Sequence, residues 1–184
     1  TPRGQLEAQP NDPKTFDILP IRLASPLKKH SYLIRQLQEI EYGVRLGQAI
    51  ARAQPDVVVC ANTPLAAIAI AQAGCQRRRT PFVFWVMDVY SVAVHAHMRR
   101  ALPVVGSLIG RFYKWLERRS LRASDRIISI SEGFEAILDD WQIDRTRRAV
   151  MPLWAPLHEL PLRPKDNPWA RRAGLAEQLT ILYS

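Results

Sequence analysis

The fold class is decided by the stretch 81–88, which reads Pro81-Phe82-Val83-Phe84-Trp85-Val86-Met87-Asp88. Its apolar residues follow one another without a polar interruption, which is typical of a strand buried on both faces of a parallel sheet. Residues 56–61 and 125–130 have the same character, and residues 148–152 predict a short fourth strand. Residues 16–23 predict an edge strand, because Pro20 interrupts an apolar run there.

Helical patterns separate these runs. Apolar residues recur at helical spacing within 31–53. Asn62-Thr63-Pro64 opens an alanine-rich helix that we expect to stop at Gly74. After a loop that follows Asp88, residues 105–121 predict another helix, and residues 132–141 predict the last. The alternation of strands and helices predicts an α/β fold with a doubly wound parallel sheet.

The composition indicates a basic globular domain. The chain has 184 residues, enough for one α/β domain, and a formal net charge of +9. This excess of positive charge favours an anionic partner, although an ordinary arginine-rich surface would give the same count. Cys60 and Cys75 lie in apolar surroundings without metal-like spacing, which favours a reducing compartment.

The candidate site residues follow the predicted strands. Ligands of open parallel sheets bind at the carboxyl ends of the strands, and the loops there begin at Asn62, Asp88 and Ser131. Asp88 is the candidate catalytic residue, since a carboxylate there can act as a base or orient a hydroxyl; the alternative is a helix-capping aspartate. Ser131 and Glu132 open a helix whose backbone N–H groups can accept an anion, or simply form an ordinary helix start.

A basic, aromatic helix is predicted over 107–122. Basic and aromatic side chains on one amphipathic helix suit the surface of an anionic membrane. The alternative is an ordinary crossover helix that packs on the sheet. The residues expected to face the membrane are Arg111, Lys114, Trp115, Arg118 and Arg119.

Several familiar sites are missing from the sequence. No Gly-x-Gly-x-x-Gly or Walker-type loop occurs, so a dinucleotide cannot be held in the usual way. Gly43-x-x-x-Gly47 and Gly106-x-x-x-Gly110 indicate close helix packing rather than membrane spans. His95-x-His97 lacks further ligands nearby, so we expect no metal.

Four stretches together resemble the family-four glycosyltransferases with the GT-B architecture, closest to the bacterial exopolysaccharide and colanic-acid-type enzymes. The order and approximate spacing of the stretches carry the resemblance more than any one of them does. They are residues 55–64, residues 81–90, residues 115–133, and the series Met151–Pro156, Asn167–Trp169, Gly174-Leu175 and Thr180–Ser184.

The resemblance implies two Rossmann-like domains that face each other across a cleft. The N-terminal one binds the acceptor, often a lipid-linked sugar at the membrane, and the C-terminal one binds the nucleotide-sugar; no metal or other cofactor is needed. Asp88 matches the family's position at the cleft, and Tyr90 matches an aromatic residue close by. Asn62, Thr63, Ser131 and Glu132 would line the acceptor side.

On this resemblance, residues 1–179 form the acceptor domain, without its first strand and with an interdomain segment from about residue 152. Residues 180–184 would begin the donor domain. We therefore expect a fragment that is inactive by itself, from a cytoplasmic protein peripheral to the inner face of the cell membrane. The sequence departs from the family pattern at Ser91-Val92-Ala93, where Pro and an acidic residue are usual, and at Leu153, where Asn is usual.

Two other functions stay open at this point. The arginine excess also fits a basic nucleic-acid-binding module, but no nucleic-acid motif is present, so we expect no nucleic acid as partner. Half of a GT-B-like sugar-nucleotide epimerase is the nearest enzyme alternative.

Overall fold

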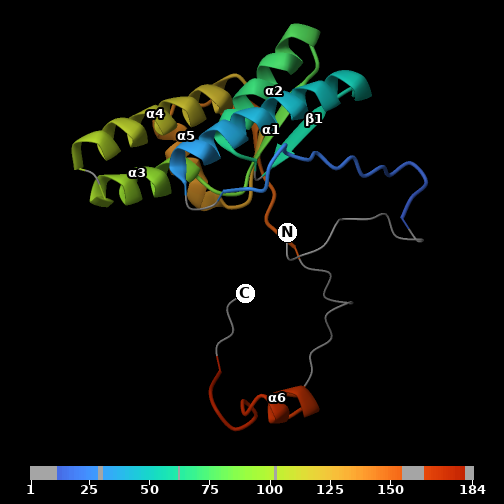
Figure 1. Ribbon diagram of the computed structural model, residues 1–184, viewed down its shortest axis with the longest axis vertical. Helices are drawn as coiled ribbons and strands as arrows, with labels where there is room; N and C mark the ends of the chain where they lie inside the picture. The colour runs from blue at the N-terminus through green and yellow to red at the C-terminus, as the bar shows by residue number, and fades with distance from the viewer. Residues whose placement is uncertain (1–11, 29–30, 62, 102, 155–163, 181–184) are drawn as a thin grey trace. The chain divides into compact units, whose positions relative to one another are not determined.

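The computed structural model describes residues 12–28, 31–61, 63–101, 103–154 and 164–180 (Figure 1). The chain forms two compact units, Thr1–Pro152 and Leu153–Ser184, and each is described by itself. The first carries the sheet. Within the second, α6 (Pro168–Arg172) begins at Asn167, whose side chain accepts a hydrogen bond from the backbone N–H of Ala170.

The described residues of the first unit form a four-stranded sheet in which every neighbouring pair is parallel. The strands follow one another across the sheet in chain order, so the connections between the described strands all advance across the sheet in the same direction. The prediction of a parallel α/β sheet is confirmed. Its strands are β1 (Val58–Ala61), β2 (Phe82–Val86), β3 (Arg126–Ser129) and β4 (Arg148–Val150).

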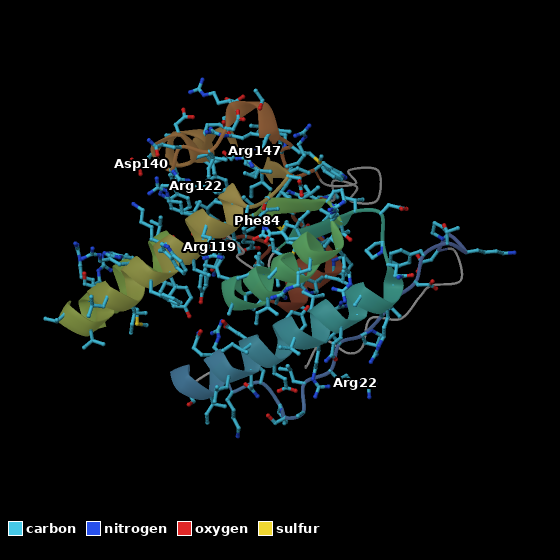
Figure 2. All side chains as sticks on the ribbon, turned by 90° about the horizontal axis from the view of Figure 1, so that it is seen from above. Arg22, Phe84, Arg119, Arg122, Asp140 and Arg147 are labelled. Carbon is cyan, nitrogen blue, oxygen red and sulfur yellow. The ribbon has the colours of Figure 1, made fainter. Side chains whose placement is uncertain are left out.

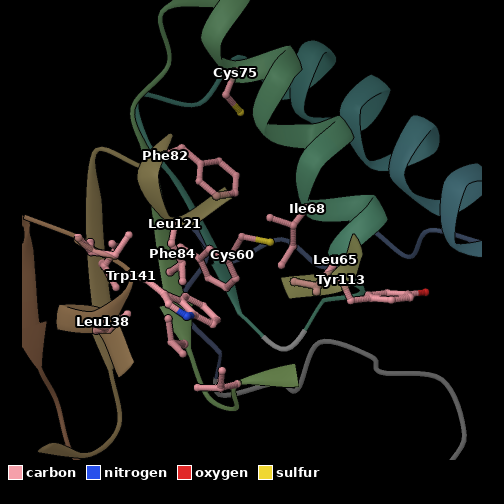
Figure 3. Close-up of a cluster of buried hydrophobic side chains, with 14 residues drawn as sticks. Cys60, Leu65, Ile68, Cys75, Phe82, Phe84, Tyr113, Leu121, Leu138 and Trp141 are labelled. Atoms are coloured by element: carbon pink, nitrogen blue, oxygen red, sulfur yellow. The ribbon is translucent and has the colours of Figure 1, made fainter. Parts of the chain in front are cut away.

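Alternate residues of the strands build the core. Phe82, Phe84 and Val86 of β2 are buried, whereas Val59 of β1, on the opposite face, is 54% exposed. Three helices complete the buried cluster: α2 (Leu65–Arg78), α4 (Pro103–Arg122) and α5 (Glu135–Asp140). Figure 3 shows that Ile68, Leu121 and Leu138 from these helices belong to one cluster with the strand residues. These helices therefore cover one face of the sheet.

The helix predicted over 31–53 is confirmed as α1 (Tyr32–Ala53). The helix that follows β1 does not stop at Gly74 but continues to Arg78 and ends at Arg79, which has a left-handed backbone with φ 58°. Gly74 adopts ordinary helical geometry and needs no special conformation, so the stop signal was misplaced. The helix predicted over 132–141 consists of a 3-10 turn (Glu132–Phe134) followed by α5.

Two sequence expectations are wrong. Residues 16–23 form no strand; the segment that follows is instead held by side chains of α1, since Glu41 accepts from the N–H of Ala24 and Gln38 accepts from the N–H of Lys28. The loop expected after Asp88 is a helix, α3 (Tyr90–Ala101), which includes the two histidines at 95 and 97. It packs mainly along α4, and Val94 also packs against the core cluster, so an expectation of one helix between two strands did not find it.

Glycines set the close packing of the helix pairs, and α3 lies beside α4 along much of its length (Figure 1). A Cβ on Gly106 would lie 2.0 Å from the backbone oxygen of Met98, and one on Gly110 would lie 2.3 Å from Nδ1 of His95. A Cβ on Gly43 would lie 2.7 Å from the Cα of Ala67, whereas Gly47 has nothing within 4 Å. Three of the four glycines are therefore packing contacts.

This packing predicts opposite effects for two identical substitutions. Gly106→Ala forces the backbones of α3 and α4 apart and should lower the free energy of unfolding by about 1–3 kcal/mol. Gly47→Ala meets open space inside a helix and should raise it by about 0.5–1 kcal/mol. Urea unfolding followed by circular dichroism measures both. Equal stability of the two variants would contradict the close approach of α3 and α4.

Candidate functional site

A crevice of about 170 Å³ opens at the carboxyl ends of β1 and β2. It receives residues from β2, from the loops that follow β1 and β2, and from the helices α1, α2, α3 and α4. A larger hollow of about 600 Å³ lies between residues 19–22 and α1, away from the strand ends. The crevice is lined by Arg35, Glu39, Thr63, Pro64, Leu65, Ile68, Phe84, Trp85, Met87, Asp88, Tyr90 and Glu117.

Glu117 forms the floor of this crevice. It comes from α4, is 2% exposed, and its carboxylate accepts hydrogen bonds from the backbone N–H groups of Tyr90 (3.1 Å) and Ser91 (3.0 Å). These are the first N–H groups of α3, which have no partner inside their own helix. Burial raises the pKa of the Glu117 carboxyl, and the hydrogen bonds from Ser91 and Tyr90 oppose that rise.

Glu117 therefore takes the capping role that was the alternative for Asp88. The side chain of Asp88 is exposed at the mouth of the crevice. It lies close enough to Glu117 for the two negative charges to interact, which adds to the rise in the pKa of Glu117. A carboxylate in this position is available to a ligand's hydroxyl group.

A second buried carboxylate comes from α1. Glu39 is 5% exposed and pairs with Arg35, one turn earlier, with Nε of Arg35 at 3.0 Å from Oε1. The hydrogen bond to Glu39 raises the pKa of the Arg35 guanidinium. Beside them, burial raises the pKa of Tyr113 to about 12, so its phenol stays protonated and can donate. Among the described residues, Arg35 is the one basic group that lines the crevice.

Two further polar groups line the crevice. The hydroxyl of Thr63 donates to the backbone oxygen of Ala61 at 2.9 Å, which leaves its lone pairs able to accept. The indole Nε1 of Trp85 is buried and has no hydrogen-bond partner among the described residues. A buried donor without a partner costs about 1–3 kcal/mol.

The structure brings together some of the predicted residues. Asp88, Thr63 and Tyr90 line the same crevice, whereas Asn62 lies outside the described residues. Ser131 and Glu132 follow β3 at the same end of the sheet but do not line the crevice. The Ser131 hydroxyl accepts a hydrogen bond from the backbone N–H of Gly133 at 3.1 Å. This contact is that of an ordinary helix start, the alternative given for Ser131 in the sequence analysis.

Sequence reasoning missed Arg35, Glu39 and Glu117. An arginine and a glutamate four residues apart on a helix usually form a solvated surface pair, so Arg35 and Glu39 carried no signal. Glu117 had one: it is the single acidic residue between 89 and 124, among many basic ones. An isolated carboxylate in a basic helix needs donors of its own, and α3 supplies them.

The membrane-facing residues predicted on α4 lie on its outer face. Arg111, Lys114, Trp115 and Arg119 are exposed and Arg118 is partly so. The structure adds an exposed apolar row along the same helix, at spacings of one to four residues. It consists of Val104 (77% exposed), Val105 (55%), Leu108 (62%), Phe112 (55%) and Trp115 (53%).

Two other kinds of site are absent from the described residues. No helix among them is long and apolar enough to cross a membrane. No group of three histidine, cysteine or carboxylate side chains in this part of the chain could hold a metal ion. His95, one of the two histidines noted in the sequence, packs against Gly110 of α4.

The comparisons with known proteins bear on this arrangement. The family model described as "Glycosyl transferase 4-like domain" matches residues 3–154, which is most of the chain and includes every residue that lines the crevice. A comparison with curated proteins found no match, and neither did a comparison with solved structures. The parallel sheet, with its crevice at the strand ends, agrees with this match. The chain therefore belongs to the glycosyl transferase 4-like domain family and is a glycosyltransferase domain.

Proposed function

We propose that this domain holds the sugar acceptor of an enzyme that transfers a sugar from a nucleotide-sugar donor. The observation that carries the proposal is the convergence of Asp88, Glu39 and Glu117 in one crevice at the carboxyl ends of β1 and β2. Carboxylates accept hydrogen bonds and do not donate them, and sugar hydroxyls supply the donors.

The charge of the crevice favours the acceptor over the donor. Three carboxylates face one guanidinium, and that guanidinium already pairs with Glu39. A nucleoside diphosphate would be repelled there. The volume of about 170 Å³ is also below that of pockets for larger ligands, which begin at roughly 300 Å³. We propose that a separate donor-binding domain holds the diphosphate, so this domain alone catalyses little transfer.

Asp88 is the proposed catalytic residue of the acceptor side. Its carboxylate is not needed for the cap of α3, because Glu117 provides that cap. It can therefore orient the attacking hydroxyl and take its proton as the hydroxyl oxygen bonds to the sugar's anomeric carbon and the bond from that carbon to the departing nucleoside diphosphate breaks. Tyr90, at the first turn of α3, lies beside it with a ring on which a sugar face can pack.

We propose further that the enzyme works at an anionic membrane, in polysaccharide biosynthesis, on a lipid-linked acceptor. The pair α3–α4 contains seven basic residues between 90 and 122, and its single acid, Glu117, is buried. The apolar row of α4 lies among these charges. Basic residues near an anionic surface contribute about 1 kcal/mol each, and the exposed aromatic and aliphatic side chains add burial in the interface.

Asp88→Asn tests the acceptor site. Losing a charged hydrogen-bond acceptor should weaken the binding of methyl glycosides of neutral hexoses by about tenfold or more, measured by saturation-transfer difference NMR. The control is Asp56→Asn, an exposed aspartate at the other end of β1, which should bind as the unchanged chain does. Equal affinities in the two variants, no glycoside binding at all, or displacement by uridine diphosphate would count against the proposal.

Glu117→Gln tests the floor of the crevice. Glutamine has one acceptor oxygen, and its NH₂ would face a backbone donor, so we expect a loss of about 1–3 kcal/mol in the free energy of unfolding. The folded chain binds the Glu117 proton more tightly than the unfolded chain does, so this group lowers stability as the pH rises from the ordinary carboxyl range through the raised pKa. The stability of Glu117→Gln should not fall in this way as the pH rises. The stability of Glu132→Gln, an exposed control, should still fall. Urea unfolding at several pH values measures both.

Replacing two residues of the apolar row tests the membrane surface. Leu108→Ser with Phe112→Ser removes exposed side chains only, so folding should be unaffected, while affinity for vesicles of phosphatidylcholine and phosphatidylglycerol should fall by about two orders of magnitude. Leu37→Ser with Ile40→Ser, on the exposed face of α1, is the matched control. Tight, salt-sensitive binding of duplex DNA that neither pair changes would favour the nucleic-acid alternative instead.

A further inference from the structure

A basic hollow lies at the C-terminal end of α4, outside the crevice. It encloses about 500 Å³ and is lined by Trp115, Arg118, Arg119, Arg122 and Ala123. Figure 2 labels Arg119 and Arg122 along this part of the helix. We call this hollow the arginine basin. It begins at Trp115, where the exposed apolar row of α4 ends.

Two of its guanidinium groups are held in place by the same two acceptors. Nε of Arg118 and Nε of Arg122 donate to the backbone oxygen of Trp141, at 3.3 and 3.2 Å. Their Nη2 atoms donate to Oε1 of Gln142, at 3.3 and 3.0 Å. Two like charges are thus fixed side by side by neutral groups, and each guanidinium keeps N–H donors that these bonds do not use.

The third guanidinium is placed by the aromatic ring at the edge of the basin. Arg119 lies over the ring of Trp115, with Cζ at 5.5 Å from the ring centre. A cation over an indole face is attracted by the ring and retains its outward N–H groups. The basin therefore presents three arginines, two of them oriented before any ligand arrives.

The neighbouring carboxylates are engaged elsewhere. Asp139 accepts from Arg145 and Arg148, and Glu135 pairs with Arg148. Asp140, at the end of α5, lies 3.9 Å from the Nζ of Lys114. Within the described part of the chain, no carboxylate pairs with Arg118, Arg119 or Arg122. No described carboxylate therefore compensates their charges.

We propose that the arginine basin binds the phosphate of an anionic lipid headgroup. Fixed guanidinium groups suit a phosphate, because their planar N–H pairs match its oxygens. The position at the end of the apolar row favours a lipid as the source, since acyl chains can lie against Phe112 and Trp115 while the phosphate enters the basin. This inference rests on the proposed membrane surface and adds to it a specific headgroup site.

The sharpest test changes no charge. Gln142→Asn shortens the side chain that fixes Arg118 and Arg122, at a position with φ 55° that asparagine tolerates. Vesicles of phosphatidylcholine with phosphatidylglycerol are the probe, with affinity measured by co-sedimentation and folding checked by thermal denaturation. We expect this variant to bind several-fold more weakly than the unchanged chain.

A charge-matched pair of variants completes the test. Arg118→Gln with Arg122→Gln should weaken vesicle binding at least tenfold more than Arg99→Gln with Arg100→Gln, which removes the same charge from the exposed end of α3. Calorimetry with glycerol 3-phosphate distinguishes the source: we expect weak binding, lost in the basin variant, far below the affinity for vesicles.

The outcomes separate the two proposals. Equal losses in the two pairs, with no effect of Gln142→Asn, would overturn the basin while leaving a diffuse membrane surface intact. A chain that ignores vesicles but binds glycerol 3-phosphate or nucleic acid through Arg118 and Arg122 would overturn the lipid assignment together with the membrane surface. If the basin variant and the control variant bound both vesicles and glycerol 3-phosphate equally well, the basin would be overturned. The proposal of the acceptor crevice would not be affected by that result.

Discussion

The buried carboxylate of Glu117 is the interaction on which the crevice depends. It comes from the middle of α4 and accepts the first two N–H groups of α3, so it joins these helices at the point where β2 delivers Asp88. Burying a carboxylate is costly unless it is fully hydrogen-bonded, and the free N–H groups of a helix start are suitable partners with a favourable dipole. Without this contact, α3 would lose its start, and neither Tyr90 nor Asp88 would have a fixed position.

The sequence was sufficient for the sheet and insufficient for the helical hairpin. Runs such as Val83–Val86 are apolar on both faces, so their strands were recognisable one at a time. The segment 90–101 has histidines, a methionine and few charges, and it becomes a helix because Gly106 and Gly110 allow α4 to approach it. That information lies in a neighbouring segment, and reasoning along one stretch does not find it.

The candidate site, like the fold, was predicted from the sequence only in part. Thr63 and Asp88 could be predicted because strand ends meet at one edge of a parallel sheet, whereas Tyr90 was expected from the family resemblance. Glu39 and Arg35 enter from α1, which precedes the sheet, and no periodicity in the sequence says which end of a helix lies over a crevice. Ser131 shows the converse: its position at a strand end was right, and its hydroxyl is nonetheless used for its own turn.

The charges of the domain are segregated, and an aromatic series joins the two regions. The crevice gathers carboxylates, whereas the outer side of α3–α4 gathers cations. From Tyr90 in the crevice, ring centres succeed one another at 5.9 Å to Tyr113, then to Phe112, and again at 5.9 Å to Trp115 at the edge of the basin. A lipid-linked sugar has the same kinds of parts: polar hydroxyls, a phosphate and an apolar tail. A surface that binds the tail and phosphate at α4 would hold the hydroxyls near Asp88, so the affinity of the membrane surface would contribute to the orientation of the acceptor as well as to its capture.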